Sequence, residues 1–303
     1  MEIKRILRCG LVLFVLFLLV NETVFAQVKM VSVAPDDINS SIETVHSPNI
    51  ALYDSSAFSR HQLILMIQGT GGSATDMRIM DSIFAGWGYH VVSIDYKNNV
   101  ISTICEHSKN KRCSYQFRKE IITGKPLSPK TEVDSVNSIL NRFTTFINYL
   151  AHHDASGHWG QFLKGEKMLW NKVIVAGHSQ GAGHAAMLGK MFKLHRALIF
   201  SGPQDYLIDL KMPSPWLSRK SATPENRFYA FLHKEDPFNV NYQIANCSEL
   251  MQHVPHDTLM VHAGKPIKGK SHILVANIDT QHPHGSTLSP VFINVWKYML
   301  GIQ

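Results

Sequence analysis

One stretch decides the fold: Val173-Ile174-Val175-Ala176-Gly177-His178-Ser179-Gln180-Gly181-Ala182-Gly183. A short apolar run leads into the pattern Gly-x-Ser-x-Gly, and an alanine-rich helical segment follows, so the order is strand, tight turn, helix. The pattern alone arises by chance in loops, but these flanks favour a catalytic turn. The turn lifts the Ser179 hydroxyl above the sheet, and the helix N-terminus points its N–H groups and dipole at a developing oxyanion. Ser179 is therefore the predicted nucleophile.

Short apolar runs that end in loop-forming residues recur along the chain. They lie at 63–67, 91–94, 197–200, 228–232 and 273–276. Such runs are typical of strands buried on both faces of a parallel sheet. Helical patterns fill the gaps, at 76–87, 133–150, 182–194 and 290–300. The alternation predicts one α/β domain over 27–303, with a doubly wound, mostly parallel sheet, helices on both faces, and ligands at the carboxyl ends of the strands.

Two segments, at about 97–130 and 206–226, interrupt this alternation as loop insertions. We expect the first to overhang the site as a cap and the second to form the opposite wall, because long loops in compact domains are usually functional or mobile. A merely structural excursion is the alternative for each. Loop aromatics usually serve ordinary packing, but three of them could stack on a sugar: Trp159, Tyr206 and Trp216.

The N-terminus has the layout of a secretory signal peptide. Lys4, Arg5 and Arg8 precede an apolar run over 11–20, and small residues lead up to Ala26. The run is too short to cross about 30 Å of hydrocarbon at about 1.5 Å per residue. We predict that residues 1–26 are removed by cleavage near Ala26 and that the mature protein is secreted or periplasmic.

Charge and composition limit the classes of partner. Removing residues 1–26 takes away three basic and two acidic residues, which lowers the formal charge from +7 to +6. The remaining charge is spread through loops without a dense basic block, so a nucleic-acid partner is not expected. The composition, with 45% apolar and 17% charged residues, is that of a globular protein. We expect no stable membrane insertion once the signal peptide is gone.

Three cysteines remain in the mature chain, and an exported protein can oxidise them. Cys105 and Cys113 bracket a short polar loop that could curl back on itself, so we predict a disulfide between them. Cys247 is then the odd thiol, and we expect it to be a buried small hydrophobe.

The serine needs a base, and the base needs an orienting acid. Asp236 follows the apolar run at 228–232, and Asp205 follows the preceding run, so both are acid candidates; Asp236 is preferred. Glu235 adjoins Asp236, but side-chain direction should admit one of the two. The base should follow the last strand. His284 is preferred because Gly285 relaxes the backbone behind it, whereas His282 precedes a proline that restricts it.

The second oxyanion donor should come from the glycine-rich loop after 63–67. We expect the backbone N–H of Thr70, or alternatively of Gly71, to act with that of Gln180. The loop lacks a following Gly-Lys-Ser/Thr, which argues against phosphate binding. The cluster His253, His256 and His262 matches no zinc spacing, so neither a metal nor a cofactor is expected.

Together these motifs resemble the α/β-hydrolase superfamily of serine esterases and lipases, from about residue 60 to the C-terminus. More narrowly, they are similar to a group of exported hydrolases. The matching stretches are 177–186, Ser201-Gly202-Pro203-Gln204-Asp205, 233–236 and His284-Gly285-Ser286. The resemblance implies a triad of Ser179, Asp236 and His284, and it also implies the bridge between Cys105 and Cys113.

The sequence therefore predicts an exported serine hydrolase, acting on a small-molecule, carbohydrate or lipid ester through an acyl-enzyme. A peptidase or an acyltransferase would use the same triad. A binding protein on a retained hydrolase fold is the non-catalytic alternative.

Overall fold

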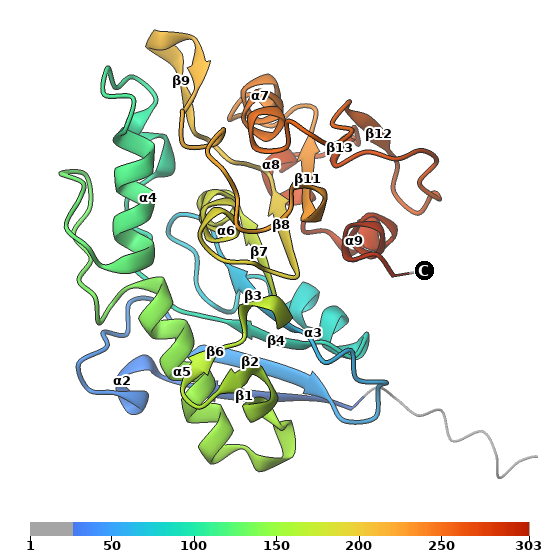
Figure 1. The fold of residues 1–303 in the computed structure, drawn as a ribbon. Coiled ribbons are helices and arrows are strands. Elements are labelled where there is room, and N and C mark those ends of the chain that lie inside the picture. The colour runs from blue at the N-terminus through green and yellow to red at the C-terminus, as the bar shows by residue number, and fades with distance from the viewer. Residues whose placement is uncertain (1–26, 303) are drawn as a thin grey trace, which may run out of the picture.

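The computed structural model describes residues 27–302. The predicted signal peptide and its cleavage site lie outside the described residues. Within residues 27–302, nine strands form one large sheet (Figure 1). Their order across the sheet is β1 (Val28–Val33), β2 (Asn49–Asp54), β4 (His90–Ser93), β3 (Leu63–Ile67), β7 (Val173–His178), β8 (Arg196–Phe200), β11 (Phe228–His233), β13 (Ile273–Ala276) and β12 (Leu259–Val261).

The sheet is mostly parallel, since β2 pairs antiparallel with both β1 and β4 while the remaining pairs are parallel. The chain passes from β3 to β4 on one side and returns to place β7 on the other side of β3. The strand order therefore reverses between β3 and β7. In open α/β sheets, the crevice at the carboxyl ends of such strands is where ligands bind.

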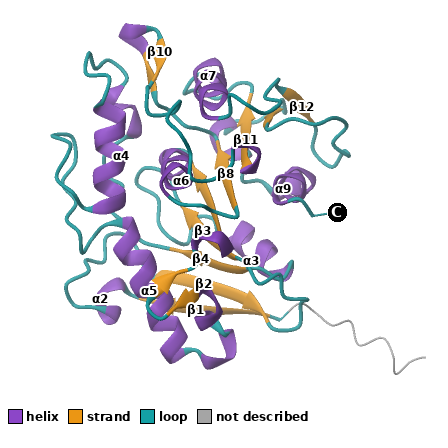
Figure 2. Ribbon diagram, viewed as in Figure 1, coloured by secondary structure: helices purple, strands orange, loops and turns teal. Residues whose placement is uncertain are grey.

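Helices cover both faces of the sheet, as Figure 2 shows for α4 and α5 on one side and α9 on the other. Their bounds are α2 (Pro35–Ile38), α3 (Arg78–Gly86), α4 (Cys113–Thr123), α5 (Ile139–His153), α6 (Gln180–Met191), α7 (Val240–Leu250), α8 (Pro283–Ser286) and α9 (Ile293–Leu300). Two buried cores follow. One lies under α4 to α7, with Phe117, Phe143 and Leu250, and the other lies under α3 and α9, with Phe84 and Trp296. The α/β class predicted from the sequence is confirmed.

The apolar runs became strands close to their predicted bounds, but some helices differ. The predicted helix at 133–150 begins at Ile139, because Ser138 caps it by accepting a hydrogen bond from the Asn141 N–H. The insertion at 97–130 is not wholly a loop, since it contains α4. The insertion at 206–226 contains a short hairpin of β9 (Tyr206–Leu207) and β10 (Met212–Pro213). A second small hairpin joins β5 (Leu163–Lys164) to β6 (Lys167–Met168).

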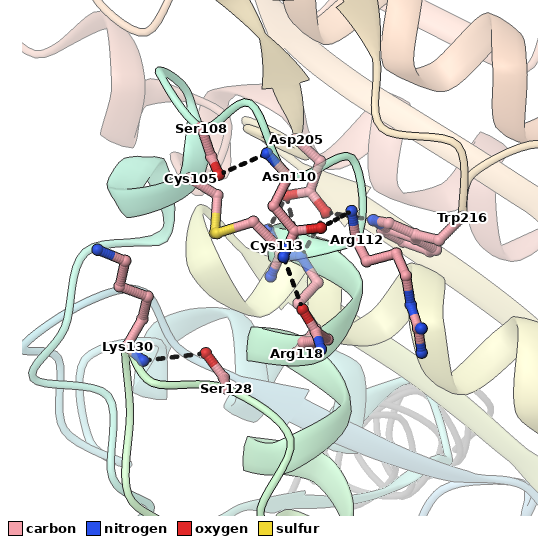
Figure 3. The surroundings of a disulfide bond; sticks show 11 residues. Cys105, Ser108, Asn110, Arg112, Cys113, Arg118, Ser128, Lys130, Asp205 and Trp216 are labelled. Atoms are coloured by element: carbon pink, nitrogen blue, oxygen red, sulfur yellow. Dashed lines mark hydrogen bonds and ion pairs between the residues drawn. A yellow bond between two sulfur atoms is a disulfide. The ribbon is translucent and has the colours of Figure 1, made fainter.

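A disulfide closes the first insertion. Cys105 and Cys113 are bonded, with their Cα atoms 5.6 Å apart (Figure 3). Cys113 is the first residue of α4, so the bridge ties the start of this helix to the turn before it. Cys247 lies buried as a free thiol, and burial raises its pKa. Across residues 27–302, no helix has the length and apolar content that a membrane crossing requires.

Removing the bridge should cost stability. Because it closes a loop with a sequence separation of 8, we expect the double variant Cys105→Ser, Cys113→Ser to lose about 2–3 kcal/mol of unfolding free energy. Urea titration of the mature protein measures this, with the buried thiol variant Cys247→Ala as the matched control under reducing and oxidising conditions. Addition of a reductant should lower the stability of the wild type and leave that of the double variant unchanged.

Candidate active site

Ser179 lies between β7 and α6 on a strained turn. Its φ is 56° and its ψ is −115°, a conformation that residues other than glycine rarely adopt. The two flanking glycines are sterically required. A Cβ on Gly177 would come within 2.0 Å of the Gly181 carbonyl oxygen, and one on Gly181 would come within 1.9 Å of the Ile67 oxygen. The turn therefore packs tightly against β3 and holds the serine at the point where the strand order reverses.

Asp236 and His284 come together although they are 48 residues apart. The Oδ2 atom of Asp236 lies 2.8 Å from Nδ1 of His284, and the Asp236 side chain is fully buried. Asp236 follows β11 in a turn, and His284 lies in the short helix α8 that follows β13. The β11 and β13 strands are parallel neighbours, so their carboxyl ends bring both residues to the same edge of the sheet.

The Asp236 carboxylate is held in its ionised form. Burial raises its pKa, but the hydrogen bond from His284, the charge of that ring and the Phe238 N–H together lower the pKa below its usual value. The Phe238 N–H donates to Oδ1 at 2.9 Å, so both carboxylate oxygens have a donor. An ionised carboxylate on Nδ1 keeps the proton there and leaves Nε2 as the acceptor.

Ser179 and His284 line one cavity of about 440 Å³. The Nε2 atom of His284 is buried and has no hydrogen-bond partner within residues 27–302, so it is free for a proton from the cavity. The loop after β3 approaches closely, since a Cβ on Gly69 would lie 3.5 Å from the Ser179 hydroxyl oxygen. Apolar side chains complete the cavity wall, among them Met77, Ile101 and Leu288.

The loop with Thr70 is tied to the first residue of α6. The Thr70 hydroxyl donates to Oε1 of Gln180 at 2.7 Å. Gln180 begins the helix, so its backbone N–H has no partner within α6. Of the two alternatives in the loop, Gly71 already donates its N–H to the Asn98 carbonyl at 3.1 Å. The Gly71 N–H is thus already engaged, and Thr70 stays the predicted donor. Asn98 also braces the loop by donating to Gly69 O at 2.8 Å.

Two residues that were not selected from the sequence bind the backbone of His284. Nε2 of His178 donates to the backbone carbonyl oxygen of His284 at 3.0 Å, and Oγ of Ser201 donates to the same oxygen at 2.7 Å. The His178 ring also lies 4.8 Å from the His284 ring. Desolvation and the charge of His284 lower the pKa of His178 to about 4, although the carbonyl bond and Asp236 act in the opposite direction. Its position inside Gly-x-Ser-x-Gly was the available signal.

A neutral His178 makes stability depend on pH. Below the unfolded value of 6.5 the unfolded chain takes up a proton that the folded protein refuses until about pH 4, so stability is lost as the pH falls through this window. We expect His178→Gln to remove about 2–3 kcal/mol of that loss. Urea titrations between pH 4.5 and 7 measure it. His152→Gln, an exposed change on α5, should keep the wild-type profile, and an unchanged profile in His178→Gln would contradict the assignment.

Asp205, the alternative acid, is engaged elsewhere. Its carboxylate forms a buried ion pair with Arg118 of α4, with Nε 2.7 Å from Oδ2, and it also accepts from Nε1 of Trp216 at 2.7 Å (Figure 3). Arg118 donates in turn to the Gln180 carbonyl at 2.9 Å. The pair therefore anchors α4 to the start of α6, next to Ser179, and Asp205 is not free to orient a histidine.

The remaining candidates lie away from the cavity. His282 and Glu235 are exposed, and Glu235 lies 3.9 Å from Lys234. His253 of the proposed histidine cluster lies 3.0 Å from a Glu225 oxygen. Within residues 27–302, no group of three or more metal-ligating side chains is close enough to hold an ion.

The structure thus places a serine on a strained turn and a carboxylate-bound histidine with an unpartnered ring nitrogen around one cavity, which the Thr70 loop also lines. No protein-family model matches the chain, and a search of curated proteins finds no match. What this site can do therefore follows from its own geometry.

Proposed function

We propose that the protein is a serine hydrolase of the α/β-hydrolase type that cleaves carboxylic esters through an acyl-enzyme. One observation carries the proposal. The Ser179 turn opens into the same cavity as Nε2 of His284, whose other nitrogen is bound to buried Asp236. A nucleophile, an orienting acid and a base that follow one another along the chain as Ser, Asp and His are the pattern of this superfamily.

The chemistry has two halves. His284 Nε2 takes the proton of Ser179 while Oγ attacks the ester carbonyl carbon, and the carbonyl oxygen gains the electron pair. The N–H groups of Thr70 and Gln180 stabilise that oxyanion. The bond to the alcohol oxygen then breaks, and the leaving alcohol takes the proton from His284. Water next attacks the acyl carbon, gives its proton to His284, and releases the acid as Ser179 recovers its proton.

Export is part of the proposal. The disulfide between Cys105 and Cys113 suits an oxidising compartment, and the N-terminal pattern of charge and apolar residues predicts a cleaved signal peptide. We therefore place the mature enzyme outside the cytoplasm. N-terminal sequencing of the exported protein should begin at Gln27.

A fluorophosphonate probe tests the site directly. The phosphorus bonds to an activated serine oxygen and fluoride leaves, so the wild type should gain one adduct on the peptide that contains Ser179. Ser179→Ala and His284→Ala should gain none, while exposed His282→Ala should label like the wild type. A folded wild type that stays unlabelled would overturn the proposal in favour of a binding protein on the same fold.

A further inference from the structure

A second cavity lies beside the catalytic one. It measures about 260 Å³ and is lined by polar and aromatic side chains that include Glu106, Gln204, Tyr206, Phe238, Asn239 and Tyr242. These residues come from three separate parts of the chain: the turn before α4, the segment after β8, and the start of α7. Both loop insertions thus contribute to its wall.

The two cavities share Phe238. Phe238 lines both of them, and the centroid of its ring lies 4.7 Å from that of the His284 ring. On the other side, the Ser102 hydroxyl, which lines the catalytic cavity, donates to Oε1 of Gln204 in the second cavity at 3.4 Å. The two cavities therefore adjoin at Phe238 and at the Ser102–Gln204 hydrogen bond.

The aromatic wall is flat. Tyr206 of β9 and Tyr242 of α7 stack with ring centroids 4.1 Å apart and ring planes only 2° from parallel. The stack covers the inner faces of the two rings, so the aromatic surface that remains for a ligand is an outer ring face, the ring edges and two phenol hydroxyls. Around it the cavity offers a carboxylate from Glu106, an amide from Asn239 and a hydroxyl from Thr103. Flat aromatic contact beside several hydrogen-bonding groups suits a ring that has apolar C–H faces and hydroxyl edges.

The two tryptophans that the sequence offered for stacking on a sugar, Trp159 and Trp216, do not line this cavity. Trp159 is buried and donates to Asp154 at 2.8 Å, and Trp216 is buried and donates to Asp205. Their rings serve packing. Of the three aromatic residues with a potential for stacking, Tyr206 lines an open cavity.

We propose that the second cavity is a sugar subsite, which binds a hydroxyl-rich ring as the alcohol part of the ester. This inference rests on the proposed esterase function and narrows its substrate class to carbohydrate esters. An anionic ligand is disfavoured because the lining carries a carboxylate and neither lysine nor arginine. An ammonium ligand is disfavoured because its aromatic cage needs ring faces converging from several sides, whereas these two rings are parallel. Oε1 of Glu106 lies 3.6 Å from Nε2 of the neighbouring His107.

Binding and catalysis can be tested separately. Saturation-transfer NMR of the full mature protein would use the methyl glycosides of glucose, galactose, mannose and xylose, with tetramethylammonium as the cationic comparison. At least one glycoside should receive saturation at its ring protons. Tyr206→Ala should abolish the transfer, and Tyr149→Ala, which removes a tyrosine stacked on His153 in α5, should retain it. Glu106→Gln, an exchange at a partly exposed side chain, should weaken binding about fivefold.

The activity measurement compares the O-acetylated form of the bound glycoside with p-nitrophenyl acetate, which has no sugar. The ratio of the two kcat/KM values should fall about tenfold in Tyr206→Ala and stay at the wild-type value in Tyr149→Ala. Absence of glycoside binding, binding that survives in both Tyr206→Ala and Glu106→Gln, or a preference for tetramethylammonium would overturn the subsite. A wild type that cleaves neither ester while binding a glycoside would instead overturn the proposed hydrolase.

Discussion

Ser179→Ala should lower kcat for p-nitrophenyl acetate by about 10⁵-fold or more, because removing the nucleophile of a serine triad abolishes nearly all covalent catalysis. In the proposed mechanism, the Ser179 hydroxyl is the group that bonds to the acyl carbon. The fold should remain, since alanine keeps the Cβ and the tight turn. Steady-state kinetics of the purified variant, with circular dichroism as the test of folding, measures both expectations.

A second substitution at position 179 distinguishes the cost of backbone strain from the loss of the catalytic hydroxyl. Ser179 has a φ of 56°, which costs a residue with a Cβ about 1–3 kcal/mol. Ser179→Gly should therefore be as inactive as Ser179→Ala but more stable by about 1 kcal/mol, after the greater flexibility of glycine in the unfolded chain is counted. Equal activity in the wild type and Ser179→Ala would mean that another group is the nucleophile.

Parts of this fold follow directly from residue pattern. The runs at 63–67, 173–176, 197–200 and 228–232 are continuous and apolar because both faces of these strands are covered by helices. A pattern of this kind depends on neighbours in sequence, so it predicts strands well. It also predicts the strand–turn–helix around Ser179, because the two glycines mark a backbone approach that admits no Cβ.

Other elements are invisible to such a pattern. β1 pairs at the edge of the sheet, where its side chains are partly exposed, so it has no continuous apolar run. α4 was hidden in the first insertion because its buried face includes Arg118 and Glu120, charged residues whose partners lie elsewhere in the chain. Arg118 meets Asp205 at a separation of 87 residues, and only the folded chain brings these charges together.

The candidate site likewise combines residues that the sequence predicts with contacts that it does not predict. Ser179 and the region of His284 could be predicted from position after a strand. The backbone carbonyl of His284, however, is bound by His178 and Ser201 across separations of 106 and 83 residues. Main-chain contacts of this kind leave no local signature. The second cavity was likewise hidden, because its wall combines residues from both insertions and α7.

The two acid candidates give the other large expected effect. Asp236→Asn should lower kcat about 10⁴-fold with little loss of stability, because the amide loses the charge that holds His284 in its productive tautomer but keeps nearly the same shape. Asp205→Asn should act on stability instead. It leaves the Arg118 guanidinium buried without its counter-charge, which costs about 3–5 kcal/mol. Thermal unfolding and p-nitrophenyl acetate kinetics on both variants distinguish the two roles.

A matched rescue completes the comparison. Arg118→Met combined with Asp205→Asn removes both buried charges, so the double variant should recover part of the stability that Asp205→Asn loses. No second substitution of this kind should rescue Asp236→Asn, because its defect lies in the protonation of His284 rather than in an unpaired charge. If Asp205→Asn were the inactive variant and Asp236→Asn the active one, Asp205 would be the acid that orients His284. Its pairing with Arg118 of α4 would then have to break during catalysis. The buried Arg118–Asp205 pair would then be part of the catalytic machinery rather than the anchor of α4 to α6.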